Sequence, residues 1–184
     1  MDSMHPDEPH TTAERAVPSA KDEIIKEAKR LEENTLYSSK GHFAAAQFWG
    51  GSHLWIGMAI SAVSAVAAAF TFSDSYRLAV GILALVVAML SAVATFLNPN
   101  EKAATHLTAG NSYDALCTRS RVFWTIECWK EGNTEQILTE KLRDLCDEKT
   151  KLNQSCPQIP GWAYKRARQR IEAGEGVYQV DKRA

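Results

Sequence analysis

The chain has 184 residues and a formal net charge of −1, with 21 Lys and Arg against 22 Asp and Glu. This balance gives no general signal for a nucleic-acid partner, so we predict none. Hydrophobic residues make up 45% of the chain and charged residues 23%, as in an ordinary soluble protein, but their distribution is uneven. Two long stretches carry no charge, and the formal charge is confined to the segments around and between them.

The N-terminal region divides into a polar tail and a helix. Residues 1–18 contain prolines, histidines and scattered charge without an apolar period, which predicts a disordered tail. Ser19 followed by Asp22 or Glu23 is typical of a helix start, and Ile24, Ala28 and Leu31 then share one stripe. We expect an N-terminal cytoplasmic helix over residues 19–51, with Gly41 as a position where it could be interrupted.

Residues 52–98 predict a transmembrane hairpin. The stretches 54–72 and 78–97 contain no charged residue, and each reaches the roughly 18 to 20 apolar positions that cross a bilayer core of about 30 Å. The aromatic residues that bracket the first stretch are typical of membrane interfaces: Trp49, Trp55, Phe70 and Phe72. Only residues 73–77 separate the stretches, so the spans must be antiparallel neighbours and both chain ends must lie on one side.

The charges at the ends of the spans predict which side that is. Lys40 and Lys102 flank the outer ends, and Lys and Arg are more abundant beyond them than in the connecting loop. The positive-inside rule therefore places both termini in the cytoplasm.

Residues 99–184 predict a cytoplasmic helical region. Asn98 could cap a helix that starts at Pro99, carries Tyr113 and neighbouring apolar residues near one face, and is broken at residues 132–133. The other members of that face are Ala103, Leu107, Gly110, Cys117 and Trp124. A second helix carries Leu138, Leu142, Leu145 and Leu152, and a proline-rich linker leads to a helix over residues 162–173. The predicted fold is all-α: an integral membrane two-helix hairpin with N- and C-terminal cytoplasmic helices.

Small and hydroxylated residues recur on one face of each predicted span. They alternate at spacings of three and four, which keeps each set on one side of its helix. Small faces let membrane helices approach closely. These faces could seal the hairpin against itself, or they could meet other subunits or line a weakly polar path. The candidate pore or packing residues are Gly57, Ser61, Ser64 and Thr71 in the first span and Gly81, Ala84, Ala88, Ser91 and Thr95 in the second.

Catalytic chemistry has little support in the sequence. We find no nucleophile–base pair, phosphate-binding glycine loop or paired carboxylates, and we expect no enzyme activity, no metal and no cofactor. The four cysteines form no C-x-x-C pair and are interpreted as reduced, packed thiols. A basic cluster, Lys165, Arg166, Arg168 and Arg170, could contact anionic lipid or an anionic ligand, but Glu172 and Glu175 favour a solvated helix face.

Several segments, in their order around two spans, resemble the SLATT family of bacterial two-transmembrane effector domains. The matching segments are residues 36–43, 96–99, 110–116 and 156–160, and the similarity covers roughly residues 22–181. The resemblance implies a membrane effector in antiphage or conflict systems, activated by a nucleotide second messenger made by a partner. The family supplies neither catalytic residues nor an established ligand pocket.

These features together predict a homo-oligomeric effector of the bacterial inner membrane that permeabilises the bilayer and causes growth arrest or death. Its partners would be itself, the bilayer, and a cyclic nucleotide or partner protein. We expect the residues that receive or couple the signal among Lys40, His42, His106, Tyr113 and Arg119; for the histidines, local hydrogen bonding is the simpler interpretation. The alternative function is a non-conducting, membrane-anchored scaffold that recruits a cytoplasmic partner.

Overall fold

The computed structural model describes residues 19–176, and the tail predicted for residues 1–18 lies outside that range. The elements in chain order are α1 (Ala20–Phe70), η1 (Asp74–Tyr76), α2 (Arg77–Leu97), α3 (Pro99–Thr125), η2 (Glu127–Trp129), α4 (Glu135–Ser155) and α5 (Gly161–Glu172). The described part of the chain is all-helical and contains no strand.

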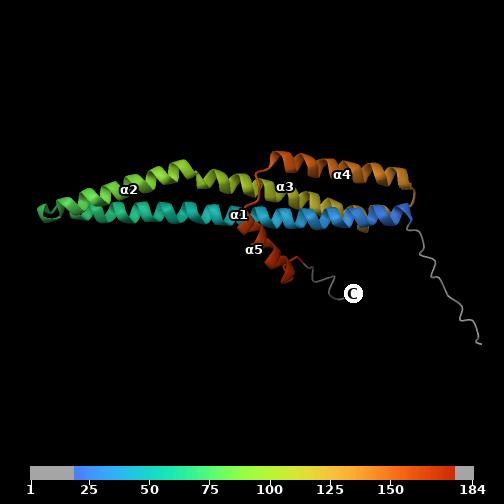
Figure 1. Ribbon diagram of the computed structural model, residues 1–184, viewed down its shortest axis with the longest axis horizontal. Helices are drawn as coiled ribbons and strands as arrows, with labels where there is room; N and C mark the ends of the chain where they lie inside the picture. The colour runs from blue at the N-terminus through green and yellow to red at the C-terminus, as the bar shows by residue number, and fades with distance from the viewer. Residues whose placement is uncertain (1–18, 177–184) are drawn as a thin grey trace, which may run out of the picture.

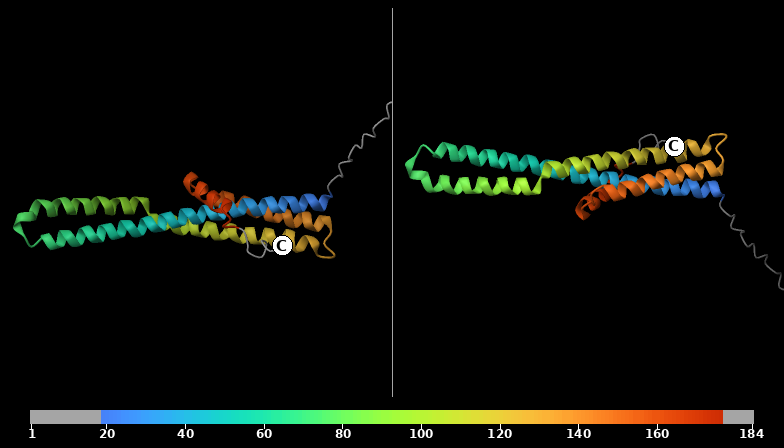
Figure 2. Two further views of the ribbon diagram at one scale, coloured as in Figure 1. Left: turned by 90° about the horizontal axis from the view of Figure 1, so that it is seen from below. Right: turned by 90° about the horizontal axis from the view of Figure 1, so that it is seen from above.

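A single long helix, α1, organises the molecule (Figure 1). Its 51 residues span about 75 Å at 1.5 Å per residue. After the turn at η1, α2 runs back beside the C-terminal part of α1, and α3 continues beside its N-terminal part. Both views in Figure 2 show the resulting rod, with α4 and α5 packed only on the half that holds α3.

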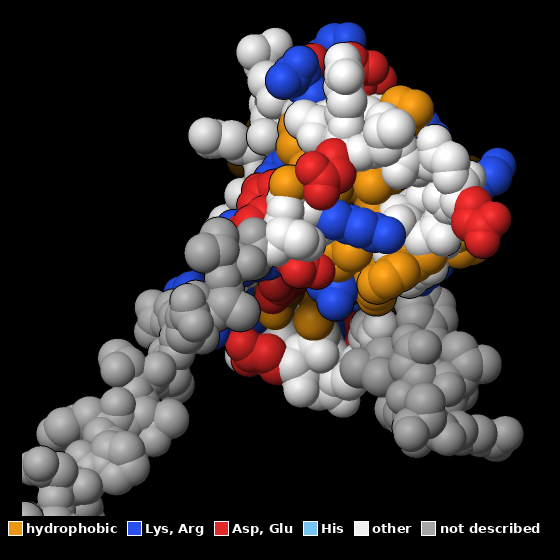
Figure 3. All heavy atoms as spheres, turned by 90° about the vertical axis from the view of Figure 1, so that its right-hand side faces the viewer, with side chains coloured by type: hydrophobic (Ala, Val, Ile, Leu, Met, Phe, Trp, Pro, Cys, Tyr) orange, Lys and Arg blue, Asp and Glu red, His pale blue; other side chains and the backbone are white. Residues whose placement is uncertain are grey.

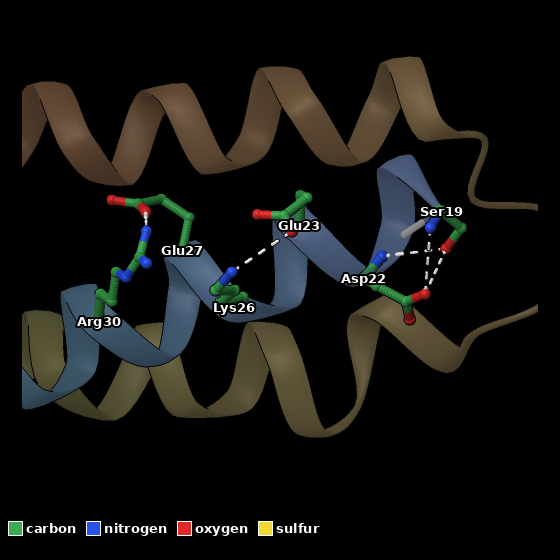
Figure 4. A network of polar contacts seen from close by, with 6 residues as sticks. All are labelled: Ser19, Asp22, Glu23, Lys26, Glu27 and Arg30. Atoms are coloured by element: carbon green, nitrogen blue, oxygen red, sulfur yellow. Dashed lines mark hydrogen bonds and ion pairs between the residues drawn. The ribbon is translucent and has the colours of Figure 1, made fainter. Parts of the chain in front are cut away.

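The predicted cap begins α1. The Ser19 hydroxyl accepts a hydrogen bond from the Asp22 amide at 3.2 Å, and the Asp22 carboxylate accepts one from the Ser19 amide at 3.3 Å (Figure 4). This reciprocal pair is a capping box, which satisfies two amides that the first turn leaves without partners. Ion pairs within the next turns, Glu23 with Lys26 and Glu27 with Arg30, lie on the exposed surface.

The interruption considered at Gly41 is absent, and α1 also passes through Gly50 and Gly51 without a break. A glycine in a helix interior costs only about 1 kcal/mol relative to alanine, so tertiary packing can override it. Gly41 is buried, and a Cβ there would lie 3.0 Å from the Ile159 side chain. The glycine therefore admits the side chain of Ile159, from the linker between α4 and α5, and does not end the helix.

The predicted end of α3 was placed wrongly, whereas its predicted start at Pro99 is confirmed. The α3 helix stops at Thr125, not at residues 132–133, because η2 intervenes before the turn in which Gly132 adopts a φ of 89°. Asn98 forms no capping hydrogen bond; it adopts the left-handed conformation, and its side-chain amide contacts the Glu101 carboxylate. Pro99 does occupy the start of α3, so the chain bends at Asn98 as the proline predicts.

The hydrophobic core lies entirely in the half of the rod that contains α3, α4 and α5. Near the N-terminus of α1 it comprises Ile24, Ala28, Phe123, Cys128 and Leu138, and near the middle it comprises Ala44, Ala45 and Ala163. Seen from the end opposite the turn, this half shows side chains of both charges interspersed with hydrophobic ones (Figure 3). Leu107, expected on the packed face of α3, is instead 50% exposed.

Candidate functional site

The half of the rod nearest the turn has an apolar exterior. The chain has two helices that are long and apolar enough to cross a membrane. No described side chain from residue 46 to residue 98 is buried, and Leu78, Leu85 and Phe96 are at least 60% exposed. In water this surface would be costly, because apolar area contributes roughly 25 cal/mol per Å² when it is removed from solvent.

Larger apolar side chains form the contact between the two apolar helices. On α1 the half-buried positions are Ile56, Ile60, Val63 and Ala67, at spacings of four, three and four. On α2 they include Val80, Leu83, Val87, Leu90 and Ala94. Branched and small side chains at this period interdigitate along one seam.

The small-residue faces lie outside that seam. All four candidates in the first span are exposed: Gly57, Ser61 and Ser64 on α1, and Thr71 directly after it. On α2, Gly81, Ala84, Ala88 and Thr95 are exposed, and Ser91 is half-buried at the edge of the seam. A Cβ added at Gly57 or Gly81 would meet no atom within 4 Å. Within one chain these faces therefore do not form the contact between the two helices.

Hydroxyl groups on these faces bond to their own helices. Thr71 donates to the Ala67 carbonyl at 2.9 Å, and Thr95 donates to the Ser91 carbonyl at 2.9 Å. A hydroxyl satisfied in this way can face an apolar neighbour without an unpaired polar group. The faces are therefore suited to close contact with another helix.

A buried histidine pair joins α1 to α3 where the packed half of the rod meets the apolar half. The Nδ1 atoms of His42 and His106 lie 2.9 Å apart, and the two side chains are 1% and 6% exposed. At this distance one ring must donate its N–H to the lone pair of the other, so both Nδ1 atoms cannot carry protons together. The pair is therefore a hydrogen bond between a donor ring and a neutral acceptor ring.

Tyr113 extends this contact to a third helix. Its ring stacks on His42 with centroids 5.4 Å apart, and its hydroxyl donates to the Asn153 side-chain oxygen at 2.8 Å. A polar chain thus runs from α1 through α3 to α4. Sequence reasoning missed Asn153, because nothing in the pattern of α4 distinguishes it from neighbouring solvent-facing polar residues.

Burial keeps these groups uncharged. It lowers the pKa of His42 to about 4, with a smaller contribution from His106, and it lowers the pKa of His106 as well. Burial also raises the pKa of Tyr113. At neutral pH the two histidines and the tyrosine are therefore uncharged, and two hydrogen bonds and one ring stack connect the three helices.

The other two candidate coupling residues lie elsewhere. Lys40 is half-buried on α1, outside the histidine pair. Arg119 forms an ion pair with Glu148 of α4, on the rim of a surface pocket of about 400 Å³ between α3 and α4. Lys141 on the same rim binds Glu127 at 2.6 Å. Arg119 and Lys141 are thus both paired with carboxylates, so this pocket has little unpaired positive charge with which to bind an anionic ligand.

The α1–α3 contact depends on a glycine. A Cβ at Gly110 would lie 2.7 Å from two ring atoms of Phe43, closer than non-bonded carbons approach. The absence of a side chain at Gly110 lets the Phe43 ring lie against the α3 backbone, one turn beyond His106. The helices are thereby held at the spacing that the histidine pair requires.

Among the described residues, no group of three or more His, Cys, Asp and Glu side chains is placed to hold a metal ion. The four cysteines are free, and Cys117 and Cys128 are buried.

Comparison with family models, with curated proteins and with solved structures finds no match to this chain. The resemblance described from the sequence is therefore neither supported nor opposed by a detected relative.

Proposed function

We propose that the chain inserts into the bacterial inner membrane as a helical hairpin with both termini in the cytoplasm. The apolar halves of α1 and α2 are unburied within the chain, whereas the core helix of a soluble protein is buried. The turn between them is too short to cross a bilayer, so the two helices must run in opposite directions through it. Lys40 and Lys102 near the packed half favour the cytoplasmic side for that half.

The membrane form is a homo-oligomer. Two helices cannot enclose a conduit, and the exposed faces around Gly57, Ser64 and Gly81 have no partner within one chain. In lipid, helices associate through faces of this kind because small residues allow close backbone packing. This exposure is the observation that carries the proposal.

The assembly acts as an effector in an antiphage or conflict system, as the resemblance to the SLATT family implies. A cytoplasmic signal, either a cyclic nucleotide or a partner protein, shifts the spans from a closed to a permeable arrangement. Because α1 is one continuous helix, a displacement of its cytoplasmic part moves the attached span. The His42–His106 contact holds α3 to that helix beyond the ends of the spans.

The required signal energy is moderate. A shift from 1:99 to 99:1 between closed and open states needs about 5.5 kcal/mol of differential affinity for the whole assembly. Divided among several subunits, each cytoplasmic bundle supplies only a fraction of that free energy.

Substitutions on the small faces test the proposal. Ser64→Leu and Ser91→Leu place a bulky side chain where subunits are proposed to meet, and each should change dye leakage and toxicity in cells that express the chain. Ala62→Leu is the matched control, because Ala62 is exposed on α1 but lies outside both the small face and the seam. The control should leak as the unaltered chain does.

Unchanged leakage and toxicity in both serine variants, with normal membrane levels, would contradict a role for these faces. A chain that enters the membrane, causes no leakage and still captures a cytoplasmic partner would support the scaffold instead.

A further inference from the structure

The basic cluster of α5 is divided by its ion pairs. Arg168 binds Glu172 with 2.7 Å between Nε and the carboxylate, and Arg170 lies 3.8 Å from the Glu175 carboxylate. Lys165 and Arg166 are exposed, and within residues 19–176 neither has an ion-pair partner. Glu172 and Glu175 therefore neutralise Arg168 and Arg170, but they do not neutralise Lys165 and Arg166.

Small residues fix how α5 sits on α1. Ala163 and Ala167 are 0% and 1% exposed, and Ala163 packs with Ala44 and Ala45 of α1. With that side of α5 buried, the helix period places four exposed side chains together on its opposite side. We call this surface the basic aromatic face, and its members are Trp162, Lys165, Arg166 and Gln169.

The start of α5 is directed toward the apolar half of the rod. Trp162 packs on Phe48 with ring centroids 4.7 Å apart, and Phe48 lies one turn nearer to the apolar half than Ala44 and Ala45. Figure 1 shows α5 starting against the middle of α1 and diverging from it in the direction away from the turn. Side chains of a helix tilt toward its N-terminus, so Lys165 and Arg166 lean toward the apolar half.

Aromatic rings and a further cation gather at the same level. Phe48 and Trp162 are 47% and 41% exposed although they touch each other. The Lys102 ammonium lies 4.5 Å from the centre of the Trp49 ring, beside Phe48. Partly exposed aromatic rings beside cations, continuous with a largely apolar surface, are typical of the headgroup layer of a bilayer.

We propose that the basic aromatic face of α5 is a second membrane contact, which docks on the anionic headgroups of the cytoplasmic leaflet. Trp162 lies at the level of the headgroups, and the Lys165 ammonium and the Arg166 guanidinium bind lipid phosphates. Each subunit would then contact the bilayer through its two spans and, in addition, through α5 at the membrane surface. This inference depends on the membrane insertion proposed above.

Charge complementarity selects anionic lipid as the occupant. A cation held near an anionic surface contributes roughly a fivefold bias toward docking, so the pair contributes on the order of twentyfold. The contribution falls with rising salt, because exposed charges are screened over about 10 Å at 0.1 M ionic strength.

Hydrogen exchange of the full chain in lipid nanodiscs tests the contact. Backbone amides of α5 should exchange more slowly when phosphatidylglycerol is added to phosphatidylcholine nanodiscs. The double variant Lys165→Gln/Arg166→Gln should lose most of that added protection, a change on the order of twentyfold for two cations. The matched control Lys130→Gln/Arg143→Gln removes the same charge from exposed positions at the far end of the bundle and should keep the protection.

Three outcomes would overturn the proposal: equal exchange of α5 in the two lipid mixtures, protection that persists in the Lys165→Gln/Arg166→Gln variant, or the same protection from inorganic phosphate in phosphatidylcholine nanodiscs. Unaltered exchange of α3 shows that the double variant is folded. A chain that does not incorporate into nanodiscs would refute the membrane insertion instead, so the two failures are distinguishable.

Discussion

At the scale of single residues, the histidine pair shows how burial determines protonation. His42 and His106 face each other with their Nδ1 atoms 2.9 Å apart, in a place that water does not reach. A proton on both rings would set two N–H groups against each other and place charge in a medium that solvates it poorly. Burial therefore favours the neutral pair, in which one ring donates its N–H to the other.

This arrangement predicts that acid loosens the cytoplasmic bundle. In the unfolded chain a histidine titrates at 6.5, whereas in the folded chain the pKa of His42 is about 4. Between pH 4 and pH 6.5 the unfolded state thus binds more protons than the folded state. The free energy of unfolding should therefore be highest above pH 6.5 and fall as the pH drops toward 4. For His42 the total loss is about 3 kcal/mol, at 1.36 kcal/mol per pKa unit.

Thermal unfolding of the detergent-solubilised chain between pH 7 and pH 4 measures this loss. The fall in midpoint should be much shallower in His42→Gln, and it should be kept in His53→Gln, since His53 is exposed on α1. An identical fall in the His42 variant would show that other groups control the acid response.

At the scale of elements, the contact between α1 and α3 depends on backbone proximity. Phe43 lies so close to Gly110 that a methyl group there would overlap its ring. The neighbouring helix turns carry His42 and His106, so the ring, the glycine and the hydrogen bond form one packed layer. The same principle, a small residue that admits a large neighbour, places Ile159 against Gly41.

Gly110→Ala should therefore destabilise the chain, although alanine favours a helix. The overlap costs about 1–3 kcal/mol, and the gain in helix propensity offsets about 1 kcal/mol. Gly51→Ala is the matched control, because a Cβ there meets no atom within 4 Å, and it should be neutral or stabilising. The unfolding midpoints of the two variants in detergent give the comparison; equal midpoints would show that the Phe43 ring moves aside at no cost.

At the scale of the whole molecule, two halves with opposite surfaces share one helix. Among its described side chains the half near the turn has none that is buried, and it has no charge between Leu78 and Leu97, whereas the other half has a core and a surface of both charges. Such a division suits a body with one end in lipid and the other in water. The proposed topology follows from it.

The topology predicts opposite labelling of the two ends of the rod. In a cysteine-free background, Ser75→Cys in the turn should react with a membrane-impermeant maleimide in intact cells, and Glu131→Cys beyond η2 should react only after permeabilisation. Both positions are exposed, so access differs only by side. Labelling of both positions from the same side would refute the hairpin.

The sequence by itself determined the local elements. Two charge-free runs of sufficient length predicted the long apolar helices, Ser19 with the acidic residues after it predicted the start of α1, and Pro99 predicted the start of α3. These features follow from backbone chemistry and from the apolar period, which act over one to a few helix turns. An antiparallel hairpin allows His42 and His106 to lie near each other, but the tertiary structure supplies their direct contact.

Only the tertiary structure decided the continuity of α1, the side on which the small faces lie, and the partners of Tyr113 and Trp162. Gly41 and Gly50 weaken a helix locally, but the packing of α3 and α5 on α1 outweighs that cost. The period of Gly57, Ser61 and Ser64 defines a face but not its neighbour, because Ile56, Ile60 and Val63 define an equally regular face beside it. Which of two regular faces is covered depends on how side chains of two helices interdigitate, and that is a property of the pair and not of either helix.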